Sequence, residues 1–181
     1  MKRPWLAQLF VACLLVLIFL SMHRREREPV YAGRPVGEWL DGGYEQISMA
    51  MHETGPPAAA VVFSKLRRDH PVYGSWAKYR RLWMGTPQAV RRFLPAPKSA
   101  SFDELTGCTA LLDIGPAVIP CLVGGLTDHN EAVRLSSALA LNHFQQRGSN
   151  ISPALPQLVH TTLDPNPRIR QVAASVLTAL N

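Results

Sequence analysis

The chain has 181 residues, of which 47% are hydrophobic, 18% are charged and three are cysteine, and its formal net charge is +6. After an apolar N-terminal stretch, about 150 residues remain, the length of one domain, which can bury about 68–70% of its surface. A chain of this size therefore needs no disulfide and no metal ion to fold.

The N-terminal stretch Trp5–Met22 reads WLAQLFVACLLVLIFLSM and has 18 residues without a charge. As a helix with a rise of 1.5 Å per residue it spans about 27 Å, close to the roughly 30 Å of a bilayer core. A cleaved signal peptide is the alternative, but its apolar region is usually about 7–15 residues long and precedes a small-x-small site. Residues 21–23, Ser-Met-His, do not supply that site. We therefore expect a single-pass transmembrane signal anchor over residues 5–22, after a short tail of residues 1–4.

Basic residues flank this stretch on both sides, with Lys2 and Arg3 before it and Arg24, Arg25 and Arg27 after it. Such residues tend to stay on the cytoplasmic side of a membrane. The short N-terminal tail favours an exported domain, whereas the arginine cluster favours the opposite orientation. Of these two orientations, we expect export.

Residues 23–43 are expected to form a basic juxtamembrane segment and a linker. Gly and Pro are interleaved in this segment, and Val36–Leu40 forms one amphipathic turn. Residues 44–101 are then expected to hold a first helix pair followed by a helical insertion.

The insertion, residues 65–98, is the most basic part of the chain. It contains nine Lys or Arg residues against one Asp, and five aromatic residues are interleaved with them. Dipeptides that contain proline divide it into two predicted helices, residues 72–84 and 87–94. The candidate contacts to a polyanion are Arg80, Arg81, Arg91 and Arg92.

Three interpretations of the insertion stay open. Trp76, Tyr79 and Trp83 have helical spacing, so they can form the buried stripe of a helix whose arginines face water. Alternatively, the cations attach the chain to anionic lipid, where each one near the surface adds about 1 kcal/mol. In the third interpretation they neutralise the phosphates of a nucleic acid while the aromatic rings stack on bases. An exported domain would meet little nucleic acid, so this third interpretation is the least favoured.

The C-terminal part contains an internal repeat with an offset of 36 residues. Residues 117–128, AVIPCLVGGLTD, align without a gap with residues 153–164, PALPQLVHTTLD, and the register continues with matching Asn and Arg residues. A fixed offset of roughly 20–50 residues is typical of repeat architectures. Residues 53–66 resemble residues 113–126 at an offset of 60, which places the insertion between the first unit and the later ones.

Each unit is predicted to be a helix pair. In residues 131–145 the apolar positions have helical spacing, Asp128 and Asn130 precede them as N-caps, and Gly148 follows them. A proline then opens the second helix. One pair cannot bury its apolar face alone, whereas stacked pairs can. Residues 167–180 are therefore predicted to be the first helix of a further unit.

These residues resemble the HEAT-repeat family, closely over residues 102–181 and loosely over residues 39–66. Residues 31–43, YAGRPVGEWLDGG, are also similar to the stretch after the membrane segment in small bacterial membrane-anchored HEAT-repeat proteins. The resemblance implies an all-α fold, namely a short right-handed α-solenoid of HEAT-like or armadillo-like helix pairs, preceded by one N-terminal transmembrane helix.

The resemblance also implies a structural ladder between neighbouring units, made by an Asp in a turn and an Arg in the following helix. The candidates are Asp128 with Arg134 and Asp164 with Arg170. Each exposed pair would contribute only about 0–1 kcal/mol to stability.

In HEAT-like solenoids the second helices usually line the inner curve. By this resemblance a partner surface is expected at Gln157, His160 and Thr161, with Cys121, Gly124 and Gly125 as their counterparts one repeat earlier. The alternative is that these are ordinary residues that face solvent.

No catalytic or metal-binding motif is present in the sequence. There is no C-x-x-C, H-x-x-H, H-E-x-x-H, G-x-G-x-x-G, Walker A or G-x-S-x-G motif. Cys108 and Cys121 are predicted to be unpaired thiols, although an oxidising compartment would permit a disulfide. We expect no catalytic residue, no cofactor and no metal.

The leading hypothesis is a non-catalytic, membrane-anchored helical-repeat scaffold that mediates protein–protein interaction with an unidentified protein. The alternative is a basic helical-repeat module that binds polyanions, either anionic lipid or nucleic acid. A helical-repeat enzyme such as a base-excision glycosylase would need a pocket lined by acidic and aromatic groups, and the sequence shows no acidic cluster to supply it.

Overall fold

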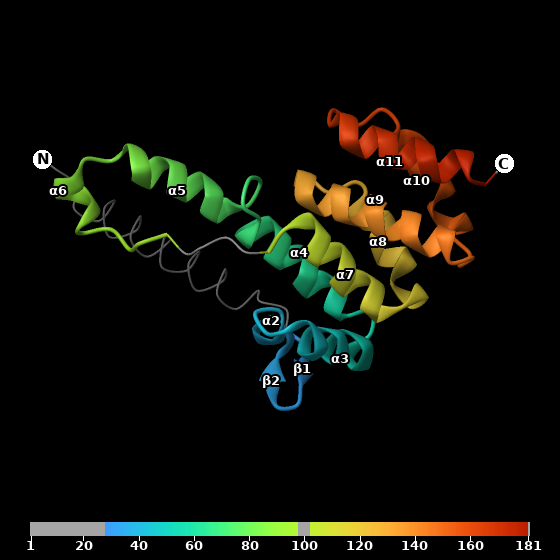
Figure 1. The fold of residues 1–181 in the computed structure, drawn as a ribbon, viewed down its shortest axis with the longest axis horizontal. Coiled ribbons are helices and arrows are strands. Elements are labelled where there is room, and N and C mark those ends of the chain that lie inside the picture. Colours follow the sequence, from blue (N-terminus) through green and yellow to red (C-terminus); the bar gives the residue numbers. More distant parts are fainter. Residues whose placement is uncertain (1–27, 98–101, 181) are drawn as a thin grey trace, which may run out of the picture.

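The computed structural model describes residues 28–97 and 102–180 (Figure 1). The predicted transmembrane segment, residues 5–22, lies outside the described residues. Within the described ranges, no single helix is both long and apolar enough to cross a bilayer. Glu104–Ile114 and Pro116–Gly125 meet the length and composition required only when taken together, as a pair bent by 110°.

The first described segment packs onto the repeats and is not the linker that the sequence predicted. Strands β1 (Val30–Tyr31) and β2 (Arg34–Pro35) form a short antiparallel hairpin, and helix α2 (Val36–Trp39) follows. Val36 and Leu40 are buried in the core, and Trp39 Nε1 donates to the Tyr31 carbonyl at 3.1 Å. The amphipathic turn is thus the apolar face by which this segment joins the domain.

The repeats are helix pairs joined by short turns. Their elements are α3 (Tyr44–Thr54), α4 (Ala58–Asp69), α7 (Glu104–Ile114), η1 (Pro116–Val118), α8 (Ile119–Gly125), α9 (Glu131–Gln146), η2 (Ser152–Ala154), α10 (Leu155–Thr161) and α11 (Pro167–Thr178). Helices α3, α7, α9 and α11 pack in series as one layer, and α4, α8 and α10 lie against them as a second layer (Figure 1). The mostly helical, solenoid-like fold is confirmed, while its right-handed turn stays a prediction.

Glycine and asparagine mark the helix ends. Of the predicted caps, Asn130 and Gly148 take this place, whereas Asp128 Oδ1 accepts from the Asn130 amide before the helix begins. Gly55, Gly115 and Gly148 follow helices with φ values of 70°, 88° and 75°, a region that strains residues with a Cβ atom. At the opposite ends, Asn130 and Asn166 Oδ1 accept hydrogen bonds from the amides two residues later, at 2.9 and 2.7 Å. These caps fix where α9 and α11 begin.

A single apolar core runs along the stack between the two layers. Fully buried members from successive helices include Leu66, Leu111, Leu122, Leu141, Leu158 and Val176. Because neighbouring pairs share this interior, each unit depends on the next for its stability.

Helices α5 (Ser75–Gly85) and α6 (Gln88–Arg91) extend away from the repeats, and we call residues 75–97 the arm (Figure 1). The insertion thus contains two helices, as predicted, but both are shorter than the predicted ranges of residues 72–84 and 87–94. Trp76, Tyr79 and Trp83 are half-buried and do not form the fully buried stripe considered above. The Arg91 guanidinium lies 4.9 Å from the Trp83 ring centroid, and Tyr79 Oη donates to a carbonyl of the returning segment at 2.8 Å. The aromatic residues thus stabilise the arm itself.

Candidate interaction surface

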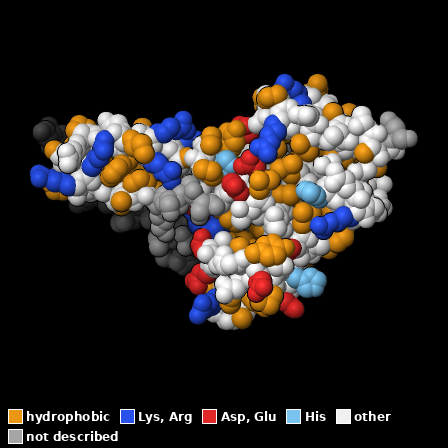
Figure 2. Space-filling view, in the orientation of Figure 1, with side chains coloured by type: hydrophobic (Ala, Val, Ile, Leu, Met, Phe, Trp, Pro, Cys, Tyr) orange, Lys and Arg blue, Asp and Glu red, His pale blue; other side chains and the backbone are white. Residues whose placement is uncertain are grey.

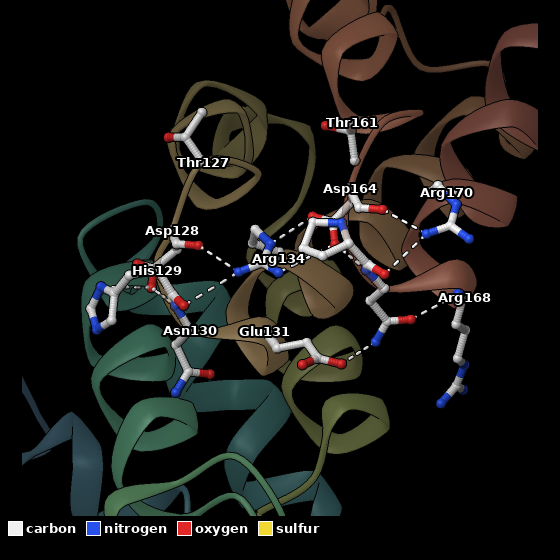
Figure 3. A network of polar contacts seen from close by, with 12 residues as sticks. Thr127, Asp128, His129, Asn130, Glu131, Arg134, Thr161, Asp164, Arg168 and Arg170 are labelled. Carbon is white, nitrogen blue, oxygen red and sulfur yellow. Dashed lines mark hydrogen bonds and ion pairs between the residues drawn. The ribbon is translucent and has the colours of Figure 1, made fainter.

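Acidic and basic side chains at the turns before α9 and α11 form a ladder between repeats (Figure 3). Arg67 of α4 pairs with Asp128, and its Nε donates to Oδ2 at 3.2 Å. Arg134 of α9 pairs with Asp164, and its Nε donates to Oδ2 at 2.7 Å. Arg134 Nη1 also donates to the Asp128 carbonyl at 2.9 Å. One guanidinium therefore joins two successive turns.

The ladder uses the expected residues but pairs them differently. Arg134 contacts the backbone of Asp128, in its own turn, and the carboxylate of Asp164, in the next turn. Arg170 repeats the first of these contacts, since its Nη1 donates to the Asp164 carbonyl at 2.8 Å. Asp128 receives its side-chain partner, Arg67, from α4, which lies outside the 36-residue register. The predicted ion pair of each Asp with the Arg six residues later is thus wrong, because each of these arginines contacts only the carbonyl of that Asp.

Partial burial distinguishes the ladder from a surface ion pair. The side chains of Arg134 and Asp164 are only 14% and 6% exposed, so removal of either partner would leave a nearly buried charge. Burial alone raises the pKa of Asp128, but the hydrogen bonds from Arg67 and from the Asn130 amide outweigh it, and the resulting pKa is lowered. Asp128 is therefore held in its ionised form.

A second network fastens the turn after α4 to the starts of α7 and α11. His70 Nδ1 accepts from the amides of Val72 and Tyr73 at 3.1 and 3.0 Å. Its Nε2 therefore donates, to Glu104 Oε2 at 2.9 Å, and Arg168 Nη1 donates to Glu104 Oε1 at 2.6 Å. The turn from which the arm departs is thus held by contacts to two helices of the stack.

An open pocket of about 510 Å³ lies where α4, α5 and the start of α9 meet. Its lining includes the charged or ionisable residues Arg67, Arg68, Lys78, Arg81, His129 and Glu131. Within residues 28–97 and 102–180, neither Lys78 nor Arg81 has an ion-pair or hydrogen-bond partner. Arg81 is one of the predicted polyanion contacts, whereas Lys78, three residues earlier on the same helix, is not among them.

The four predicted polyanion contacts have different surroundings. Arg81 lines the pocket, whereas Arg91 packs on an aromatic ring and donates to the Thr86 carbonyl at 2.7 Å. Arg92 is exposed and stacks over Phe93, and Arg80 is half-buried. Figure 2 shows basic side chains interspersed with hydrophobic ones along the arm.

The predicted partner surface on α10 is only partly accessible. Thr161 is buried, with 4% of its surface exposed, and its hydroxyl donates to the Gln157 carbonyl at 2.8 Å. Gln157 is half-buried and His160 is exposed. Of the counterparts on α8, Gly125 is buried, Cys121 is half-buried and Gly124 is exposed. The expected exposure of Thr161 and Gly125 was therefore wrong, since both positions pack inside the stack.

The HEAT-repeat family model matches residues 118–147. This match supports a HEAT-repeat domain, and its bounds enclose α8 and α9 as one unit. The internal repeat instead predicted α9 and α10 as one unit, so the predicted phase differs from the matched phase by one helix. In the matched phase, α9 and α11 are the second helices of their units. No curated protein and no solved structure gave a significant match.

Proposed function

We propose that this chain is a non-catalytic, membrane-anchored helical-repeat scaffold that binds another protein. The observation that supports this most is that the matched HEAT repeat lies inside a longer stack of helix pairs, joined by a shared core and a ladder. HEAT repeats commonly act as protein-interaction scaffolds, and proteins that contain them are generally non-catalytic. The stack provides a long, regular surface of the kind that such scaffolds use.

The phase of the match directs this proposal to a particular face. If the second helices of the solenoid line the binding surface, that surface belongs to α9 and α11. Exposed polar residues on these helices include His143, Gln171 and Ser175. His160 lies instead on α10, a first helix in this phase.

Site-specific photo-crosslinking in cells would test this face. A crosslinking residue at position 171 or 143 is expected to trap one and the same partner, whereas the same residue at position 160 is expected to trap much less of it. Equal yields at all three positions, or capture at position 160 alone, would remove the proposed face.

The membrane part of the proposal depends on the uncharged stretch of residues 5–22. The intact chain is expected to stay in the membrane fraction at alkaline pH, and a chain without this stretch is expected to be released. Protease added to sealed cells or vesicles would report whether the repeats lie on the exported side. Release of the intact chain by alkali would contradict an anchor.

Binding of polyanions by the arm is a second candidate function. Arg81 and Arg92 are exposed there beside Leu82 and Phe93, whose exposed fractions are 73% and 76%. Basic and apolar groups together suit an anionic lipid surface, to which they contribute charge and buried area. Salt titrations with anionic vesicles and with DNA would distinguish lipid from nucleic acid, and no binding to either at low salt would exclude this function.

A further inference from the structure

The pocket between α4, α5 and α9 is built on a fixed turn. Asn130 Nδ2 donates to the Tyr73 carbonyl at 3.1 Å, which joins the turn to the start of α9. A Cβ atom at Gly74 would lie 2.6 Å from both the amide nitrogen and the carbonyl oxygen of His70, so only glycine fits there without movement of the backbone. These contacts hold α5, and the side chains that it directs into the pocket, in one place.

The charges around the pocket do not balance. Arg67 and Arg68 are paired with Asp128 and Asp69. The Glu131 carboxylate accepts from the neutral Asn166 amide, so it keeps its one negative charge in the lining. Lys78 and Arg81 both line the pocket and are left without a partner in the described part of the chain. They are three residues apart on α5, so they project from the same face of the helix.

We propose that this pocket binds the side-chain carboxylates of an acidic segment of a partner protein. The inference rests on the proposed scaffold function and names the chemistry of its partner. A volume of about 510 Å³ accommodates a few side chains, and ammonium and guanidinium groups form strong charge-assisted hydrogen bonds with carboxylates. The carboxylates of Asp and Glu stand at the ends of flexible side chains, which can enter a concave pocket. A flat bilayer surface would contact only the residues at the edge of the pocket. Val72 and Tyr73 supply apolar surface for the stems.

The test uses the full chain in a neutral detergent and a fluorescent oligoglutamate peptide as the probe, with oligoglutamine of equal length as the reference peptide. Oligoglutamate is expected to bind at low salt and to weaken as salt rises. The double variant Lys78→Gln/Arg81→Gln is expected to weaken this binding by at least about tenfold, because it removes both unpaired cations. The double variant Arg34→Gln/Arg147→Gln removes the same charge from exposed positions outside both the arm and the pocket lining and is expected to change binding by less than about threefold.

Three results would overturn the proposal: no binding of oligoglutamate, equal losses in both double variants, or binding of oligoglutamine with similar affinity. If vesicles that contain phosphatidylserine bind through Lys78 and Arg81 while oligoglutamate does not, the site is a lipid contact instead. Thermal unfolding of each variant would show whether the fold is kept. Positions 143 and 171 lie outside the pocket lining, so crosslinking there tests the scaffold proposal independently of the pocket. A negative peptide result would contradict only the pocket proposal. A negative crosslinking result would contradict only the proposed face on α9 and α11.

Discussion

Gly125 of α8 lies close to side chains of two other helices. A Cβ atom there would lie 2.1 Å from Ser137 Oγ of α9 and 2.9 Å from Phe63 Cζ of α4. We expect Gly125→Ala to lower the free energy of unfolding by about 1–3 kcal/mol, because the packed interior must shift. Gly124→Ala is the matched control, since nothing lies within 4 Å of that position, and it should be neutral or slightly stabilising. Urea unfolding of both variants measures the difference, and equal effects would contradict the packing described.

The two cysteines of the repeats should differ sharply in reactivity. Burial raises the pKa of the Cys108 thiol to about 12, so almost none of it is thiolate at pH 8. Cys121 is half-buried and should be alkylated by iodoacetamide in the native protein, whereas Cys108 should react only after denaturation. Peptide mass spectrometry at successive times gives both rates. Native alkylation of Cys108 at the rate of Cys121 would show that α7 is not packed as described.

At the scale of elements, the ladder predicts how stability depends on pH. The pKa of Asp128 in the folded state lies below its ordinary value of 3.8, so its pairing with Arg67 stabilises the fold above about pH 4 and is lost as the pH falls through the folded-state value. We expect Arg67→Gln to lose stability at pH 7 and to show a shallower decline between about pH 5 and pH 3 than the wild type. Chemical unfolding across this range measures both effects.

Arg170→Gln is the control for this experiment. Its guanidinium contacts the carbonyls of Asp164 and Pro165 and, among the described residues, no carboxylate. The slope of stability against pH should therefore stay close to that of the wild type. A parallel change in both variants would mean that the pH dependence arises elsewhere.

The repeat units could be predicted from the sequence because they leave a periodic signal, as with the caps Asn130 and Asn166. The pairing of Asp and Arg residues within the ladder could not be predicted. The repeat register shows which residues recur, but it does not show which residue of the neighbouring unit each side chain contacts. The pocket was missed for a related reason. Lys78 comes from the insertion and His129 from the repeats, and only the turn at Gly74 brings these segments together. The packing of the segment at Val36 could not be predicted either, because so short an apolar pattern does not distinguish a packed helix from an isolated turn in a linker.

At the scale of the whole molecule, the two layers of the stack should fold without the arm. Within the arm, α5 buries only Ala77 and α6 buries no residue. The contact of Lys65 with the Phe102 ring and the pair His70–Glu104 join residues outside the arm, so its removal would leave them in place. Replacement of residues 75–97 by a Gly/Ser linker of equal length is therefore expected to leave helical content and cooperative unfolding of the repeats largely unchanged. It should also abolish binding of oligoglutamate and of anionic vesicles.

The matched control replaces α11 with a Gly/Ser segment of equal length. This helix buries Ile169, Ala173 and Val176, so its loss should remove several kcal/mol of stability, at about 1.5–3 kcal/mol for each large side chain. Circular dichroism during thermal unfolding compares the two variants. If the chain without the arm melts as early as the chain without α11, the arm belongs to the core and cannot be a separate binding element. If it melts with the wild type, the stack serves as a rigid base from which the arm and its pocket present their unpaired cations to a partner.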